Sequence, residues 1–197
     1  RILIPFEYTR VDNIVDLVFE TQQETDQKAQ TNADLESEDA AESANQEQGA
    51  YEFTPRDKLD EKRLKIVHAF FKLKNATPVQ RTRTNFSDSM NQVGATCAIS
   101  KRYKRDYQPY WYALHPKWLV FMRSVSDGFF VLGCMDRNEA YALPIAFIEQ
   151  NLEAMNTTEK GDKKYWHVAL TIDKGSLALN LSSIGKKIDL APYLFNV

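Results

Sequence analysis

The stretch Phe129-Phe130-Val131-Leu132-Gly133-Cys134 is an apolar run of strand length. Similar runs, rich in β-branched and aromatic residues and bounded by turn residues, predict further strands on both sides of it. We expect these strands at residues 79–84, 93–100, 110–114, 140–143, 165–172 and 176–181.

Helical patterns interrupt this series of strands. Thr54-Pro55-Arg56-Asp57 is a typical helix start, and the apolar spacing after it predicts a helix that ends near Leu73. A second helix is expected over 145–155 after Pro144, and a short one within 116–125. Because long alternation of strand and helix is missing, the order predicts an α+β fold with a mostly antiparallel sheet and two main helices.

Residues 21–50 differ in composition from the rest of the 197-residue chain. They contain no aromatic residue, one large aliphatic residue (Leu35), eight acidic residues and one lysine. Such a segment buries too little apolar surface to offset its ordering entropy, so we expect a disordered acidic linker. The linker divides the chain into a short strand-helix segment at 1–20 and a single α+β domain at 51–197. The first segment either docks on that domain or is the tail of an upstream domain.

The two cysteines, Cys97 and Cys134, stand in apolar surroundings. This setting predicts buried thiols rather than a disulfide framework, and so a cytoplasmic location. No apolar run approaches the roughly 18 residues of a membrane helix, so we expect a soluble protein with no membrane partner.

Charge is unevenly distributed, although the formal net charge is only −2. Residues 51–123 hold fifteen Lys and Arg against six Asp and Glu, whereas 124–197 hold seven against nine. Cations interleaved with aromatic rings are typical of nucleic-acid surfaces, because cations neutralise phosphates and rings stack on bases. The candidate binding residues are Arg81, Arg83, Lys101, Arg102, Lys104, Arg105, Tyr107 and Tyr110. The alternative is a solvated hairpin tip at 101–105 beside core aromatics, with Tyr103 and Trp111 expected in the core.

Catalytic patterns are weaker. A metal-dependent nuclease centre needs carboxylates and a lysine brought together, and the candidates are Asp162-Lys163-Lys164, Asp60-Glu61-Lys62 and the pair Asp136 and Glu139. The first lies in an expected turn, the second in an expected helix, and the third lacks a lysine at the required spacing. His and Cys residues show no paired ligand spacing, and glycines are never clustered, so we predict no metal and no cofactor.

Several segments together resemble a known kind of domain. They are Ser100-Lys101-Arg102-Tyr103, Tyr110-Trp111-Tyr112-Ala113-Leu114-His115-Pro116, Phe129–Cys134, Leu143-Pro144, Asn156-Thr157-Thr158-Glu159 and Tyr165-Trp166-His167-Val168. Over residues 57–195 the chain resembles an uncharacterised accessory domain of bacterial proteins, some of them associated with restriction or phage defence. The resemblance implies a DNA-directed context and supplies no catalytic residues.

Three functions therefore remain open. The leading hypothesis is a non-enzymatic nucleic-acid-binding module, for DNA in the first place, joined by the acidic linker to an upstream domain or a partner protein. The alternatives are a metal-dependent nuclease and a protein-interaction domain.

The acidic linker suggests a further hypothesis, in which residues 24–47 compete with nucleic acid for the basic surface. Deletion of residues 21–50 is then expected to tighten DNA binding and to steepen its salt dependence, as measured by titration of a labelled duplex at several salt concentrations. Unchanged affinity at low salt would contradict the competition.

Overall fold

A computed structural model describes residues 55–104, 108–161 and 163–197. The strand-helix segment expected at 1–20, the linker expected at 21–50 and the helix-start residue Thr54 lie outside the described residues.

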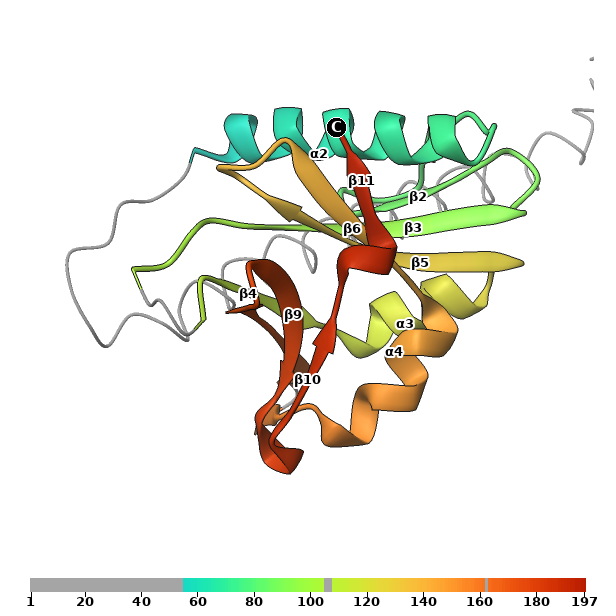
Figure 1. Cartoon of the computed structure of the whole chain (residues 1–197). Helices are drawn as coiled ribbons and strands as arrows, with labels where there is room; N and C mark the ends of the chain where they lie inside the picture. The colour runs from blue at the N-terminus through green and yellow to red at the C-terminus, as the bar shows by residue number, and fades with distance from the viewer. Residues whose placement is uncertain (1–54, 105–107, 162) are drawn as a thin grey trace, which may run out of the picture.

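The described strands form two sheets, shown in Figure 1. Sheet A has the order β1-β2-β3-β5-β6-β11, and sheet B has the order β10-β9-β8-β4, with β7 paired to β8. The strands of sheet A are β1 (Val79–Gln80), β2 (Asn85–Ser87), β3 (Val93–Ser100), β5 (Asp127–Cys134), β6 (Glu139–Pro144) and β11 (Leu194–Asn196). Those of sheet B are β4 (Tyr110–Leu114), β7 (Thr157–Lys160), β8 (Lys163–Asp173), β9 (Ser176–Leu181) and β10 (Lys186–Asp189).

Three α-helices accompany the sheets in the described residues: α2 (Arg56–Leu73), α3 (Pro116–Arg123) and α4 (Ile145–Asn151). Short 3-10 turns follow at η1 (Leu152–Ala154), η2 (Ser182–Ile184) and η3 (Ala191–Tyr193). Among the described strand pairs, β3 and β5 run parallel and every other pair is antiparallel. The predicted α+β class with mostly antiparallel strands is therefore confirmed.

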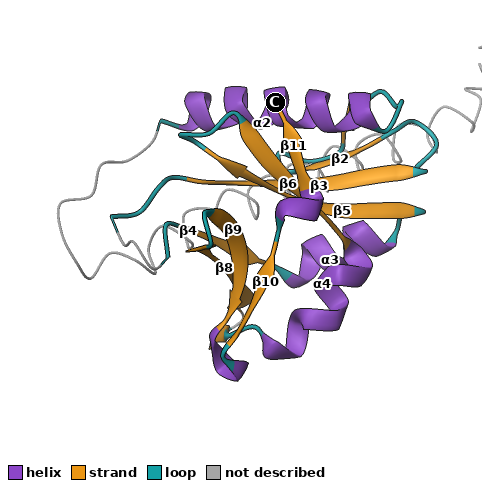
Figure 2. Cartoon of the chain, viewed as in Figure 1, coloured by secondary structure: helices purple, strands orange, loops and turns teal. Residues whose placement is uncertain are grey.

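Sheet A lies between two apolar layers. Figure 2 shows α2 on one side of sheet A and sheet B, α3 and α4 on the other. On one face, α2 packs Ile66, Val67, Phe70 and Phe71 against the sheet, because these positions repeat on one side of a helix. On the other face lies a larger core that sheet A shares with sheet B, α3 and α4. Buried side chains from all four elements fill this second layer, with Trp118, Phe130, Ile148 and Leu179 among them.

Both cysteines are buried, as their apolar neighbours predict. Cys97 belongs to the layer beneath α2, and Cys134 belongs to the core between the sheets.

One strand prediction is wrong in part. The segment 79–84 is a strand only at Val79–Gln80, and the chain then bends. Two amides cause the bend, because the backbone N–H groups of Arg81 and Thr82 both donate to the carbonyl oxygen of Asn85. The alternation expected to place Arg81 and Arg83 on one strand face is therefore absent.

The second predicted helix is shorter than expected. It is α-helical only to Asn151, whose side-chain amide donates to the carbonyl oxygen of Phe147 at 2.8 Å, and the chain continues as a 3-10 turn. Within the described residues, no helix combines the length and the apolarity that a membrane crossing requires.

Candidate nucleic-acid interface

The basic loop predicted from the sequence leaves sheet A where β3 ends. Lys101 and Arg102 follow Ser100 directly, Lys104 comes after Tyr103, and the side chains of Arg102 and Lys104 are exposed. The loop is closed where the backbone N–H of Tyr103 donates to the carbonyl oxygen of Pro109 at 2.8 Å. Arg105 and Tyr107 lie outside the described residues.

Ser100 connects three strands beneath this loop. Its Oγ accepts a hydrogen bond from the backbone N–H of Trp111 in β4 at 3.2 Å, and it donates to the carbonyl oxygen of Lys101. Its own carbonyl oxygen accepts from the N–H of Met135, just after β5. Because β3 and β5 run parallel, their carboxyl ends lie at the same edge of sheet A, and the basic loop stands beside the turn after β5.

That turn contributes a polar cluster around Tyr110. The Tyr110 hydroxyl donates to the Asp136 carboxylate at 2.8 Å, and Nε of Arg137 donates to the Tyr110 hydroxyl at 3.2 Å. Nη1 of Arg137 also pairs with Glu139 at 3.1 Å, and Nη1 of Arg102 lies 3.8 Å from Asp136. Tyr110 thus connects the start of β4 to the turn after β5.

A residue of α2 reaches the same edge. Nζ of Lys62 donates to the backbone carbonyl oxygen of Arg137. The edge therefore gathers five described cations, Lys62, Lys101, Arg102, Lys104 and Arg137, with two described carboxylates, Asp136 and Glu139, paired among them. We call this group the β3–β5 edge. Sequence reasoning missed Lys62 and Arg137, because nothing in the local pattern places a helix residue and a turn residue beside a loop that follows another strand.

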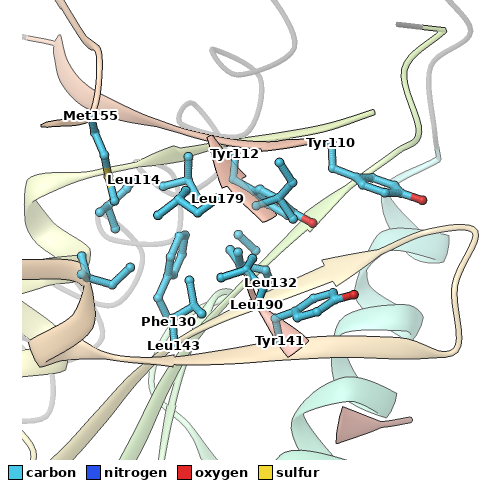
Figure 3. Close-up of a cluster of buried hydrophobic side chains, with 14 of the residues drawn as sticks. Tyr110, Tyr112, Leu114, Phe130, Leu132, Tyr141, Leu143, Met155, Leu179 and Leu190 are labelled. Atoms are coloured by element: carbon cyan, nitrogen blue, oxygen red, sulfur yellow. The ribbon is translucent and has the colours of Figure 1, made fainter. Parts of the chain in front are cut away.

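Three tyrosine hydroxyls point toward one side of the core in Figure 3, those of Tyr110, Tyr112 and Tyr141. Burial raises the pKa of Tyr110 to about 12, and the hydrogen bond to Asp136 adds to the shift. Burial likewise raises the pKa of Tyr141 to about 12, and it raises the pKa of Tyr112 well above 10. The Tyr112 hydroxyl donates to the carbonyl oxygen of Gly133 at 3.0 Å. These phenols are structural groups that stay protonated at neutral pH.

The pKa shifts predict a loss of stability in alkaline solution. A phenol whose pKa is higher in the folded than in the unfolded state contributes stability that is complete below pH 10 and is lost as the pH rises through about 12. We expect the melting temperature to fall over this interval, and the absorbance of tyrosinate to show a fraction of phenols that ionises only there. Replacement of Tyr110 by Phe should reduce that fraction, and an unchanged titration curve would contradict the assignment.

The ring of Tyr110 is fully buried in the core between the sheets. It therefore offers no face to a base, and the stacking role expected for it does not fit this placement. Its observed contacts are those of a residue that positions Asp136 and Arg137.

The other two predicted cations lie elsewhere. Arg81 is exposed but held by its own loop, where Nε donates to Ser87 Oγ at 2.8 Å and Nη2 donates to Asn91 Oδ1 at 3.2 Å. Asn91 precedes β3, whereas Lys101 follows it, so the two positions are separated by roughly 25 Å at ~3.3 Å per strand residue. The structure does not bring Arg81 to the β3–β5 edge.

Arg83 turns toward α2. Its Nε pairs with Oδ1 of Asp60 at 3.0 Å, and its side chain is only 9% exposed. The same carboxylate pairs with Arg63, a buried residue of α2 whose Nε donates to the carbonyl oxygen of Cys97 at 3.1 Å. Asp60 therefore joins two arginines beneath the helix, and Arg83 contributes to packing.

This shared carboxylate predicts a specific loss of stability. Replacement of Asp60 by Ala removes the carboxylate between the poorly exposed guanidinium groups of Arg63 and Arg83. This loss should lower the free energy of unfolding, measured in urea, by about 1–3 kcal/mol. Glu61 is the matched control, since it is exposed and, among the described residues, pairs with Lys65 in the next turn. Glu61→Ala should change stability by less than ~0.5 kcal/mol. Equal losses in the two variants would contradict the role of Asp60.

The carboxylates considered for a nuclease centre are engaged or dispersed. Asp60, Glu61 and Lys62 lie on α2, and Asp136 and Glu139 each pair with an arginine. Asp162 lies outside the described residues. Over the described part of the chain, no group of three or more His, Cys, Asp or Glu side chains is arranged to hold a metal ion.

Comparison with family models, with curated proteins and with solved structures returns no match for this chain.

Proposed function

We propose that this chain is a non-enzymatic nucleic-acid-binding module whose ligand is DNA, and that it binds the DNA phosphates at the β3–β5 edge. The observation that carries the proposal is the gathering of Lys62, Lys101, Arg102, Lys104 and Arg137 at one end of sheet A. Cations that neutralise phosphates release bound counterions, which is the main source of affinity in such contacts.

The exposure and the ion pairs of the cations at the β3–β5 edge support contact with the nucleic-acid backbone rather than with bases. Arg102 is 52% exposed, and its ion pair with Asp136 is long at 3.8 Å. Such a pair is worth little in water and exchanges readily for a phosphate. Arg137 is held by Tyr110 and Glu139, so its orientation is fixed before a ligand arrives. Phosphate contacts of this kind position a protein on nucleic acid without reading sequence.

The biological setting is part of the proposal. The resemblance to accessory domains of bacterial restriction and phage-defence proteins supports a DNA-directed role. The two buried thiols suit the reducing cytoplasm.

The experiment is a titration of fluorescently labelled duplex and single-stranded DNA with the full chain, at several salt concentrations. If all five cations contact phosphates of a duplex, the slope of log K against log salt should be about −4.5, at ~0.9 per contact. A slope near zero would overturn the proposal and favour a protein-interaction domain.

The same protein incubated with plasmid and Mg²⁺ or Mn²⁺ tests the nuclease alternative. Binding without cleavage supports the proposed module, whereas metal-dependent cleavage would reassign the chain to the nucleases.

A further inference from the structure

The outer face of sheet B, which is turned away from the shared core, carries its own set of side chains. In β4, Tyr110, Tyr112 and Leu114 enter the core, so Trp111 and Ala113 point to the opposite face. The same alternation in β8 and β9, together with the strand register, places the remaining members on this outer face. They include Tyr165, His167, Ala169, Thr171 and Ala178, and the same alternation adds the polar residues Asp173, Ser176 and Asn180.

Much of this face is withdrawn from solvent, although His167 and Ala169 are only half-buried. Trp111 and Tyr165 are each 6% exposed, and Ala178 is 1% exposed. The rings of Trp111 and Tyr165 meet edge to face, and His167 stacks on Tyr165. A sheet face open to water is normally polar, and burial of alanines between aromatic rings is typical of a face with a layer packed on it.

The described helices pack mainly elsewhere. The principal contacts of α2 are with β3 and β5, those of α3 are with β3, β5 and α4, and those of α4 are with β5, β6 and its own 3-10 extension. All three helices thus lie chiefly with sheet A. Within the described residues, Tyr103 of the loop after β3 packs against Trp111, Ala113 and Tyr165, and the rest of the layer over the outer face of sheet B is expected from another part of the chain.

We propose that residues 1–20 of this chain dock on the outer face of sheet B. Eleven of these twenty residues are apolar or aromatic, and Val11, Ile14, Val15 and Val18 share one side of a helical pattern. The other long stretch before the domain, 21–50, has Leu35 as its single large aliphatic residue and cannot form an apolar layer. This docking does not rest on the proposed nucleic-acid binding.

The length of the connecting segment and the charge of residues 1–20 both fit the docking of residues 1–20 on this face. The 34 residues between Glu20 and Pro55 span roughly 30–35 Å as a flexible chain, about twice the radius of gyration of ~14 Å expected for a domain of this size. Residues 1–20 hold four carboxylates against two arginines. The loop before β4 carries Lys101 and Lys104.

Hydroxyl-radical footprinting of the full chain tests the docking residue by residue. The variant Ile14→Asp puts a charge on the apolar side of the expected helix, and Asn13→Asp adds the same charge on its polar side. We expect Ile14→Asp to raise modification of Trp111 and Tyr165 several-fold and to leave Trp118, in the shared core, unchanged. Asn13→Asp should leave all three as in the unmodified sequence. Equal modification of Trp111 and Tyr165 in both variants would overturn the docking.

A second measurement needs no variant and remains decisive if Ile14→Asp fails to fold. Carbodiimide cross-linking joins carboxylates to nearby lysines, so Asp12, Asp16 and Glu20 should link to Lys101 or Lys104. The exposed α2 lysines, Lys58, Lys65 and Lys72, are the internal comparison. Links that fall on α2, or only between two copies of the chain, would overturn the proposal. Protection of Trp111 and Tyr165 by single-stranded DNA alone would also overturn it and assign this face to nucleic acid.

Discussion

Replacement of Lys101, Arg102 and Lys104 together by glutamine should lower the affinity for duplex DNA by roughly two to three orders of magnitude at about 0.1 M salt. The three side chains stand in the loop at the β3–β5 edge, where Arg102 and Lys104 are exposed. Removal of one phosphate-binding cation should reduce the slope of log K against log salt by ~0.9, so the triple variant should have a slope smaller by about 2.7. The measurement is fluorescence anisotropy of a labelled duplex across a salt series.

The matched control removes the same charge from another surface. Lys72, Lys186 and Lys187 are exposed and lie away from this edge, at the far end of α2 from Lys62 and in β10, and their replacement by glutamine changes the net charge equally. We expect a much smaller change in slope, because the attraction between DNA and lysines that do not contact it is screened beyond ~10 Å at 0.1 M salt. If the two triple variants lose affinity equally, binding depends on total charge and the edge has no special role.

Replacement of Gly128 by Ala should destabilise the fold by about 3 kcal/mol or more, at the upper end of overpacking effects. Gly128 lies near the start of β5, where a Cβ atom would overlap the backbone carbonyl group of Met122 in α3. Backbone atoms cannot rotate away, so α3 would have to shift on sheet A. The change is measured as the shift in the urea midpoint at constant m value.

Gly133, in the same strand, provides the control. A Cβ atom there would meet the terminal methyl groups of Ile66 and Ile99, which are ends of flexible side chains. Since these methyl groups can move to other rotamers, Gly133→Ala should cost only about 1–2 kcal/mol. Equal losses at the two glycines would show that α3 adjusts as easily as a side chain does.

The strands best predicted from the sequence are those with a strong local signal. β3, β4 and β9 begin and end where the apolar runs do. β10, with the sequence Lys186-Lys187-Ile188-Asp189, was not predicted, because its strand conformation depends on pairing with β9. β2, β7 and β11 are also short and were not predicted, and their strand conformation likewise depends on pairing with β3, β8 and β6 respectively. The division into two sheets could not be predicted either, since partner choice between distant strands leaves no local pattern.

The candidate site was predictable to a similar degree. The basic loop after β3 was visible as a run of cations, whereas its neighbours Lys62 and Arg137 come from segments far away in the sequence. Arg83 could not be recognised as a packing residue, because its partner Asp60 stands 23 positions earlier.

The chain crosses repeatedly between the two sheets. It leaves sheet A after β3, contributes β4 to sheet B, returns for β5 and β6, builds β7 to β10 in sheet B, and ends in sheet A with β11. No single cut within the described residues therefore yields two fragments that each hold a complete sheet. The two sheets are accordingly expected to form and to melt as one cooperative unit, in which local opening is confined to end strands such as β1 and β11.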